Sequence, residues 1–220
     1  EADVQWRGDV RGALRLRPFL AGAPATDYVA GDGAYLISGG VGALGVHFAR
    51  LLCERGAAKV VLVGRSELDE TRRAHLARLQ HGTTEVTYVR ADVTRAEDVE
   101  RVVDDLRRSG APLRGVLHAA GVIRDARALD KTPAQLLEVL GPKIAGALHL
   151  DRATAADPLD FFVLCSSVVA QTGNRGQTDY AYANAFLDAF AAAREAQRKA
   201  GARRGRSLSI LSLIHISEPT

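Results

Sequence analysis

A glycine-rich turn between an apolar run and an amphipathic helix constrains the fold more than any other stretch of this sequence. The run from Ala34 to Ser38 predicts a buried strand, and SGGVGALG follows over Ser38 to Gly45, before the helical stretch VHFARLLCERG. The pattern GxGxxG is weak by itself, but a strand before it and a helix after it are its required context. The turn predicts a phosphate held at a helix N-terminus, and the alternative is a tight turn without a ligand.

Five further apolar runs predict the other strands of one parallel sheet. Helical patterns separate them, and this alternation is typical of a doubly wound sheet with helices on both faces. We therefore expect an α/β, Rossmann-type fold, which suits a length of 220 residues. The expected strands are Lys59–Val63, Glu85–Val89, Gly115–His118, Phe161–Cys165 and Ser207–Ile210.

Composition argues against several classes of protein. The apolar fraction of 47% is typical of a globular domain, and the net charge is only +3. Basic residues are spread among acidic ones, so we expect no nucleic acid partner. No apolar run approaches the roughly 20 residues that span a bilayer, so we expect no membrane segment. Cys53 and Cys165 fall in a helix and a strand, and we interpret them as structural thiols in the reducing cytoplasm.

The stretch from Phe161 to Phe186 contains the residues with the clearest chemistry. Its apolar strand is followed by Ser166 and Ser167, and Tyr180 then opens a long Ala-rich helix, with Asn184 one turn later. Because ligands bind at the carboxyl ends of parallel strands, a serine and the tyrosine can face one crevice. Tyr180 is a candidate acid whose ordinary pKa of about 10 a nearby cation would lower.

Lys143 is the candidate cation. It lies in the helical stretch LLEVLGPKIAGALHL, where a lone lysine among apolar neighbours is unusual without a partner. Taken singly, these residues have ordinary explanations: a tyrosine at a helix start, serines in a turn, and a lysine that extends to solvent. Taken together with the glycine-rich turn, they favour an active site.

Lys143, Ser167, Tyr180 and Asn184 resemble the active site of ketoreductase domains of modular type I polyketide synthases, a branch of the short-chain dehydrogenase/reductases. Ordinary members of that superfamily carry Lys four residues after the Tyr, whereas here Asn184 has that position and the lysine precedes the tyrosine. The resemblance implies NADPH-dependent reduction of a β-ketoacyl thioester on an acyl carrier protein, during polyketide or fatty acid assembly. It also implies that Tyr180 donates the proton and Ser167 hydrogen-bonds the ketone oxygen. Lys143 would lower the tyrosine pKa, and Asn184 would orient the network.

The resemblance also implies a cofactor site. Arg65 stands where NAD-binding proteins usually carry an acid, so it favours the extra phosphate of NADPH, although a solvated surface arginine is the alternative. Asp92 would border the adenine, and the small residues after the fourth strand would admit the ribose and nicotinamide. His118 is interpreted as structural. The predicted cofactor-binding residues are Gly39, Gly40, Gly42, Leu44, Gly45, Arg65, Ser66, Asp92, Val93, Ala119, Ala120 and Gly121, with no metal site.

The sequence also predicts where two helices start, and it contains residues that bear on the stereochemistry of the product. Thr94 and Glu97 form a capping-box pattern for a helix over 96–108, and Thr132-Pro133 starts the helix that bears Lys143. Asp125 is the last acid of the Leu-Asp-Asp motif of one stereochemical class, and Thr172 stands where the other class has Trp. The pattern leans towards the first class and leaves the product configuration open.

The two ends differ from the expected catalytic domain, which covers residues 31–210 and is truncated before its lid. Residues 1–30 resemble the linker and last strand of the non-catalytic subdomain that precedes it, with an unstructured tail as the alternative. Residues 211–220 resemble translated sequencing-adapter read-through and are predicted to be non-native. The sequence has no Met, so we expect a piece of a longer polypeptide with neighbouring synthase domains. A catalytically silent structural domain and a free-standing short-chain reductase of small carbonyls are the alternative functions.

Overall fold

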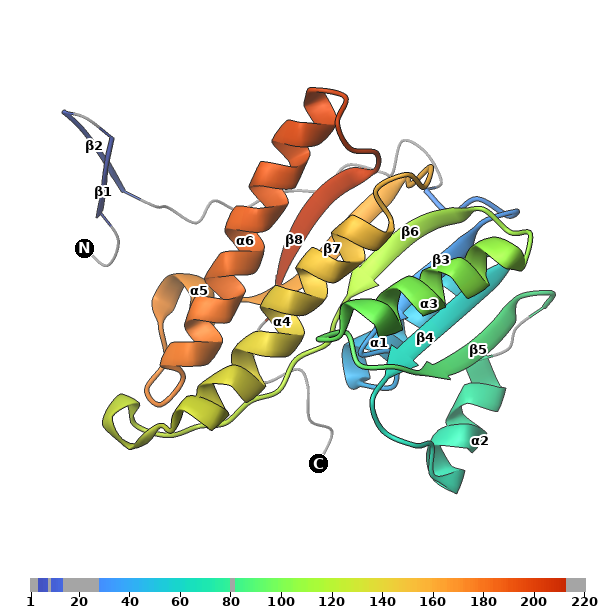
Figure 1. Cartoon of the computed structure of the whole chain (residues 1–220), viewed down its shortest axis with the longest axis horizontal. Helices are drawn as coiled ribbons and strands as arrows, with labels where there is room; N and C mark the ends of the chain where they lie inside the picture. The colour runs from blue at the N-terminus through green and yellow to red at the C-terminus, as the bar shows by residue number, and fades with distance from the viewer. Residues whose placement is uncertain (1–3, 8, 14–27, 80–81, 213–220) are drawn as a thin grey trace.

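One sheet of six parallel strands forms the centre of the protein. The computed structural model describes residues 4–7, 9–13, 28–79 and 82–212, and the sheet order within them is β5-β4-β3-β6-β7-β8. The chain starts at β3 in the middle, runs outward through β4 and β5, and returns to β6 to build the other half (Figure 1). Open α/β sheets bind ligands at such a reversal of strand order. The strands are β3 (Ala34–Ser38), β4 (Lys59–Gly64), β5 (Glu85–Arg90), β6 (Leu113–His118), β7 (Phe161–Ser167) and β8 (Arg206–Ser212).

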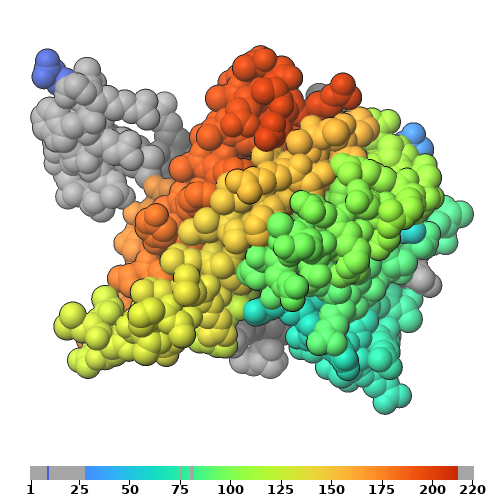
Figure 2. Space-filling model, viewed as in Figure 1, coloured from blue at the N-terminus to red at the C-terminus, as the bar shows by residue number. Residues whose placement is uncertain are grey.

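Helices cover both faces of this sheet, as the α/β prediction requires. Three of them, α3, α4 and α6, lie on the face toward the viewer in Figure 1, and Figure 2 shows them as adjacent bands. Alternate residues of β3 enter two cores: Leu36 packs in the core of α3, α4 and α6, whereas Ile37 packs in that of α1. The helices are α1 (Ala43–Glu54), α2 (Glu70–Leu79), α3 (Ala96–Arg108), α4 (Pro133–Ala153), α5 (Val169–Thr172) and α6 (Thr178–Lys199), with a 3-10 turn η1 (Ala128–Asp130).

The predicted strands are all confirmed, most of them with wider bounds. The strand that extends furthest beyond its predicted bounds is β8. It includes Leu211 and Ser212, which pair with Ser166 and Ser167 of β7. The sheet therefore continues into the segment predicted to be non-native, because strand pairing uses backbone groups that every residue carries. The remaining residues of that segment, 213–220, lie outside the described residues.

The start of α4 agrees with the prediction. Pro133 is its first residue, and the hydroxyl of Thr132 accepts a hydrogen bond from the Gln135 N–H at 3.3 Å. The Gln135 side chain accepts one in return from the Thr132 N–H at 3.0 Å. This reciprocal capping box fixes where the helix begins, and the part of Gln135 in it is not among the sequence predictions.

The capping box predicted for α3 is wrong. The residue that caps α3 is Arg95, and it makes no side-chain hydrogen bond to the helix. Thr94 instead donates its N–H and its hydroxyl to Oδ1 of Asp92, at 2.9 and 2.8 Å. A carboxylate two residues before the threonine closes a tight local turn. Because the Thr94 hydroxyl binds this nearer acceptor, it does not cap the helix.

The N-terminal segment contains two short strands, and their assignment to a preceding subdomain stays a prediction. The strands β1 (Val4–Arg7) and β2 (Val10–Ala13) pair as an antiparallel hairpin. Residues 1–3, 8 and 14–27 lie outside the described residues, so the linker prediction for them stays a prediction.

Neither a membrane span nor a metal-ligand cluster occurs in the described part of the chain. Of the helices described, none combines the length and the apolar character needed to cross a bilayer. The same residues contain no group of three or more His, Cys, Asp or Glu side chains that could hold a metal ion.

Candidate active site

The turn after β3 has positions at which only glycine fits. Gly39 has a φ of +68°, in the left-handed region, and a Cβ atom on it would lie 2.7 Å from the backbone of Ala119. A Cβ atom on Gly45 would overlap the carbonyl oxygen of Gly39. Gly42 caps α1 without a side-chain hydrogen bond, so backbone N–H groups face outward at this helix end. The turn offers partial positive charge without side-chain bulk, which suits a phosphate group.

A cavity of about 350 Å³, here called the nucleotide cavity, opens at the carboxyl ends of β3, β4, β5 and β6. Four segments far apart in the sequence therefore come together there, as the sequence analysis expects. Gly40 instead packs against β4, where a Cβ atom would lie 2.6 Å from that of Leu62. The predicted cofactor residues that line the cavity are Gly39, Gly42, Arg65, Ser66, Asp92, Val93, Ala119, Ala120 and Gly121.

Two residues of β5 hold the loop that carries Arg65 and Ser66. Arg90 donates from Nε to the carbonyl oxygen of Arg65 at 3.0 Å, and the Tyr88 hydroxyl donates to that of Ser66 at 2.5 Å. Arg72, in the first turns of α2, lines the same cavity and was missed by the sequence analysis. The nucleotide cavity therefore has two arginine side chains in its wall.

A second cavity of about 220 Å³, here called the inner cavity, adjoins the first. Gly39, Gly42, Ala119 and Gly121 line both of them, so the two cavities are neighbours separated only by these small residues. The inner cavity is completed by residues of α1, α4, β7, α6 and β8. They include the predicted cofactor residues Leu44 and Gly45, together with Lys143, Cys165, Ser166, Tyr180 and Ser212.

Lys143 reaches the inner cavity from α4 and is 4% exposed. Its Nζ donates to the carbonyl oxygen of Cys165 at 2.9 Å and lies 5.4 Å from the centre of the Tyr180 ring. A Cβ atom on Gly121 would lie 3.0 Å from its Cε, so the glycine makes room for the side chain. Burial lowers the pKa of Lys143 to about 8, while the charges of Cys165 and Asp188 act in the opposite direction.

Tyr180 lies at the start of α6 and has a pKa above its ordinary value. Burial is the main cause, and the nearby polar side chains of Asn184 and Ser167 only partly oppose it. Lys143 is not among the groups that shift this pKa, so its predicted effect on Tyr180 stays a prediction. The ammonium group faces the ring of the tyrosine, and burial outweighs the other influences on the hydroxyl.

Asn184 and the two serines form a buried layer behind Tyr180. Nδ2 of Asn184 donates to the carbonyl oxygen of Tyr180 at 2.8 Å, and the Ser166 hydroxyl donates to that of Asn184 at 3.2 Å. The Ser167 hydroxyl accepts from the N–H of Val169 at 3.3 Å and donates to the backbone oxygen of Ser212 at 3.4 Å. Oδ1 of Asn184 is buried without a hydrogen-bond partner among the described residues, so an acceptor is available beside the tyrosine.

His118 is a structural residue, as the sequence analysis predicts. Its Nδ1 lies 2.6 Å from the Ser38 hydroxyl, and its Nε2 lies 3.2 Å from the carbonyl oxygen of Lys143. Complete burial lowers its pKa to about 4, so the ring is neutral and joins β3, β6 and α4. The two cysteines are free and buried, which agrees with their interpretation as structural thiols.

Comparison with known proteins identifies the family. The family model described as "KR domain" matches residues 33–207, which is most of the chain. This chain belongs to the KR, or ketoreductase, domain family. Its fold is accordingly that of the short-chain dehydrogenase/reductases, as the glycine-rich turn and the parallel sheet indicate.

The similar proteins are polyketide synthases and ketoreductase domains. "Polyketide synthase ThaG" of Burkholderia thailandensis is 45% identical over 184 residues, and "Polyketide synthase PksN" of Bacillus subtilis is 41% identical over 180 residues. Each alignment covers 81% of this chain and 3% of the synthase, so the ketoreductase domain spans a small part of these relatives. A crystal structure of a ketoreductase domain from the bacillaene assembly line has a TM-score of 0.86 and 34% identity, covering 96% of this chain and 50% of that chain.

The ketoreductase domain brings the four predicted catalytic residues together, but not all of them reach the inner cavity. Lys143 and Tyr180 line it, whereas Ser167 and Asn184 are fully buried outside its wall, and Asn184 donates to the carbonyl oxygen of Tyr180. Ser166, which is not one of the four predicted catalytic residues, is in the wall. The roles of these residues stay predictions.

Sequence reasoning missed contacts between segments that are distant in the chain. Asp125 accepts two hydrogen bonds from Nε2 of Gln177, at 3.0 and 3.1 Å. Arg72 could have been recognised, because it lies on the helix that follows the loop of Arg65. No sequence signal indicated that the backbone of Cys165 would hold Lys143.

Proposed function

We propose that this ketoreductase domain catalyses the NADPH-dependent reduction of a β-ketoacyl thioester, carried by an acyl carrier protein, to the β-hydroxyacyl thioester. One observation carries the proposal. Tyr180 is surrounded by Lys143, Ser167 and Asn184 beside an inner cavity that continues into the glycine-rich turn. An acid, a candidate oxyanion donor and a cation are thus gathered next to the nucleotide cavity.

The residues of the nucleotide cavity fit NADPH. Gly39 and Gly45 let the turn pack against its own backbone and that of Ala119 at the N-terminus of α1, whose N–H groups would hold a pyrophosphate. Arg65 and Arg72 supply positive charge for the additional phosphate that distinguishes NADPH from NADH. NADPH, when bound, supplies the hydride that reduces the ketone carbon.

Tyr180 has the protonation state that the reaction needs. Its raised pKa keeps the phenol protonated at neutral pH, so the hydroxyl can give its proton to the ketone oxygen. Ser167, whose hydroxyl meets the backbone oxygen of Ser212 at 3.4 Å, would turn from that oxygen to donate a hydrogen bond to the ketone oxygen. The bond would stabilise the negative charge that develops there. Lys143, whose pKa is about 8, is still mainly protonated at neutral pH and stabilises the phenolate left on Tyr180.

Asn184 would orient the tyrosine. Its side-chain amide holds the backbone oxygen of Tyr180, and its free Oδ1 can accept a hydrogen bond from a water or from a substrate group. Asn184 lies one helical turn after Tyr180 on α6. Its two contacts would therefore fix the position of the phenol in the inner cavity.

The partners are proposed from the relatives. Polyketide synthases are much longer than this chain, so we propose neighbouring synthase domains and an acyl carrier protein that brings the substrate. The carrier's phosphopantetheine arm would reach the inner cavity beside Tyr180. We place this activity in the cytoplasm, where buried free thiols such as Cys53 and Cys165 stay reduced.

The test is NADPH oxidation with a short β-ketoacyl thioester, using the complete product of the gene and its Tyr180→Phe variant. We expect the variant to lose about 10²- to 10⁴-fold in kcat, the usual contribution of a general acid. Tyr182→Phe is the matched control, because that side chain is 64% exposed on the same helix. Equal turnover by Tyr180→Phe would assign the acid elsewhere, and a folded, NADPH-binding parent without turnover would favour a silent structural domain.

A further inference from the structure

Two segments far apart in the sequence meet just before the two helices that carry Lys143 and Tyr180. Residues 123–131 lead into α4, and residues 174–180 lead into α6. The N–H of Ala126 donates to the carbonyl oxygen of Gly176 at 3.1 Å, beside the hydrogen bonds between Gln177 and Asp125. The starts of the two helices are therefore joined to each other as well as to the sheet.

A buried ion pair is the strongest of these connections. Nζ of Lys131 lies 2.8 Å from Oδ2 of Asp179, and the side chains are 2% and 1% exposed. The same Nζ donates to the carbonyl oxygen of Arg124 at 2.5 Å. Ionised groups buried to this degree are costly unless they are paired, so the fold holds both charges in one geometry.

The two oxygens of Asp179 connect Lys131 with the backbone of the tyrosine. Oδ2 faces Lys131, which stands two residues before Pro133, the first residue of α4. Oδ1 accepts a hydrogen bond from the N–H of Tyr180 at 2.9 Å. A single carboxylate thus links the start of the helix that carries Lys143 to the residue that the proposed function makes the acid.

Neither member of the pair has a part in the chemistry described above. Lys131 and Asp179 do not line the nucleotide cavity or the inner cavity. Arg124 and Glu138 form an ion pair between the same segment and α4, but their side chains are 49% and 37% exposed. Burial and the contact with Tyr180 therefore distinguish Lys131–Asp179 from the neighbouring pair.

We propose that Lys131 and Asp179 are positioning residues that fix Tyr180 against Lys143 for proton transfer. The catalytic part of this inference rests on the proposed function. Helices move as rigid units, so a shift between the starts of α4 and α6 is transmitted to both side chains. A misplacement of about 1 Å in an active site can reduce the rate about a hundredfold, so a small shift of Tyr180 would be measurable in kcat.

The test removes both charges and keeps the shapes. Lys131→Met retains the length of the stem, and Asp179→Asn retains an oxygen that accepts from the Tyr180 N–H. Combining them avoids the lone buried charge that either would leave. We expect the folded double variant to lose about tenfold to a hundredfold in kcat, with unchanged KM and unchanged NADPH binding. The ring resonance of Tyr180 in isotope-labelled protein, assigned by its loss in Tyr180→Phe, should also move.

Arg124→Gln combined with Glu138→Gln is the matched control. It neutralises the exposed pair between the same segment and α4 and should change neither kcat nor the Tyr180 resonance. If the double variant at Lys131 and Asp179 does not fold, Asp179→Glu takes its place, because it keeps the charge but moves the carboxylate relative to the Tyr180 N–H. A folded variant at the buried pair with the kcat and the Tyr180 resonance of the parent would overturn the proposal.

The resonance separates this inference from the proposed function. If the parent does not reduce the thioester but the Tyr180 resonance moves in the variant and not in the control, the proposed function fails and the positioning pair stands. If the parent turns over and the variant matches it in both measurements, the pair is only structural and the proposed function stands.

Discussion

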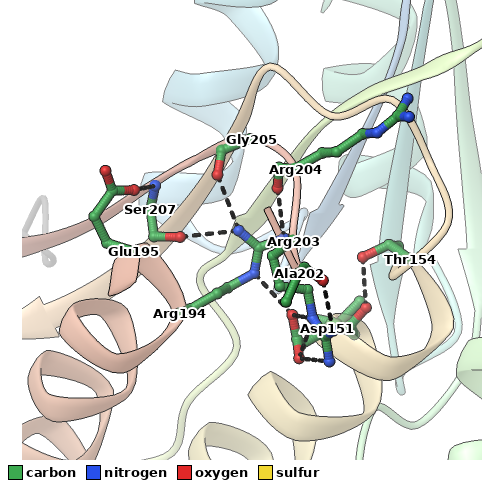
Figure 3. A network of polar contacts seen from close by, with 10 residues as sticks. Asp151, Thr154, Arg194, Glu195, Ala202, Arg203, Arg204, Gly205 and Ser207 are labelled. Carbon is green, nitrogen blue, oxygen red and sulfur yellow. Dashed lines mark hydrogen bonds and ion pairs between the residues drawn. The ribbon is translucent and has the colours of Figure 1, made fainter. Parts of the chain in front are cut away.

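Two buried cations lie at opposite ends of the sheet, and their surroundings differ. Near the amino end of β8, Nε of Arg194 donates to Oδ1 of Asp151 at 2.8 Å. Its two remaining nitrogens donate to the oxygens of Arg204, Gly205 and Ser207, as Figure 3 shows. At the carboxyl end of β7, the hydrogen bond described for Nζ of Lys143 is the one to the carbonyl oxygen of Cys165.

The difference concerns the counter-ion. Arg194 has a buried carboxylate, which Arg203 also contacts, and a ring face of Phe162 at 4.4 Å. Each of its three nitrogens donates at least one hydrogen bond, which suits a structural role. Lys143 has a carbonyl and a ring instead of a carboxylate, and its pKa falls to about 8. A buried cation with a full set of partners stabilises the structure, whereas one without a counter-ion beside a cavity is available for chemistry.

Arg194→Met should have the largest effect on the amino end of the sheet. We expect the free energy of unfolding to fall by about 3–5 kcal/mol, because the Gly205 carbonyl oxygen and the Ser207 hydroxyl lose their buried donor while Arg203 still pairs with Asp151. Denaturant unfolding measures this change. NADPH binding to the folded variant should be that of the parent, because the nucleotide cavity lies at the other end.

The control for this prediction is Arg198→Met. Arg198 pairs with Glu195 at the surface, and losing such a pair costs about 1 kcal/mol or less. Weak NADPH binding by folded Arg194→Met would show that the two ends are not independent.

The effect of Lys143→Met on the free energy of unfolding should depend on pH, unlike the effect of Arg194→Met. The folded-state pKa of Lys143 is about 8 and the ordinary value is 10.5, so the unfolded chain binds more protons between these values. The contribution of Lys143 to stability therefore rises as the pH rises from 8 to 10.5, by about 3 kcal/mol. The difference in unfolding free energy between parent and variant should change by that amount over this range. A constant difference would mean that Lys143 titrates normally and has a counter-ion like Arg194.

Arg65→Gln should have the smallest of these effects. Arg65 differs from Arg194 and Lys143 because it lies in the wall of the nucleotide cavity. There the phosphate of NADPH would be its counter-ion. We expect a loss of about 1.5–3 kcal/mol in NADPH binding, the usual value of hydrogen bonds to charged groups. Fluorescence titration measures the affinity for NADPH. The affinity of Arg65→Gln for NADH should be unchanged, and so should NADPH binding by the control variant Arg78→Gln, in the last turn of α2. Equal losses for NADPH and NADH would remove Arg65 from the phosphate site.

The fold could be predicted because its signals are local. Apolar runs such as Phe161–Cys165 are continuous, since parallel strands are buried on both faces. The glycine-rich turn was equally readable, because its function depends on backbone conformation at Gly39 and on the helix that follows. Boundaries were less certain, as the capping box wrongly assigned to Thr94 shows.

The candidate site could be predicted only in part. Its residues were identified, but their electrostatic relations were not, because burial is a property of the assembled fold. The rise in the pKa of Tyr180 is the clearest case, since a cation was present as expected and burial still prevailed. The Lys131–Asp179 pair is another, because nothing in either local sequence indicates that the two side chains meet.

The sequence by itself determined the α/β class, the position of the glycine-rich turn and the identity of the four predicted catalytic residues. Those features depend on periodicity and on residue types within short stretches. Only the tertiary structure decided which cation is paired, which serine lines the inner cavity and how the starts of α4 and α6 are joined. The reason is physical: pairing and burial depend on distances between residues that the chain brings together only when it folds.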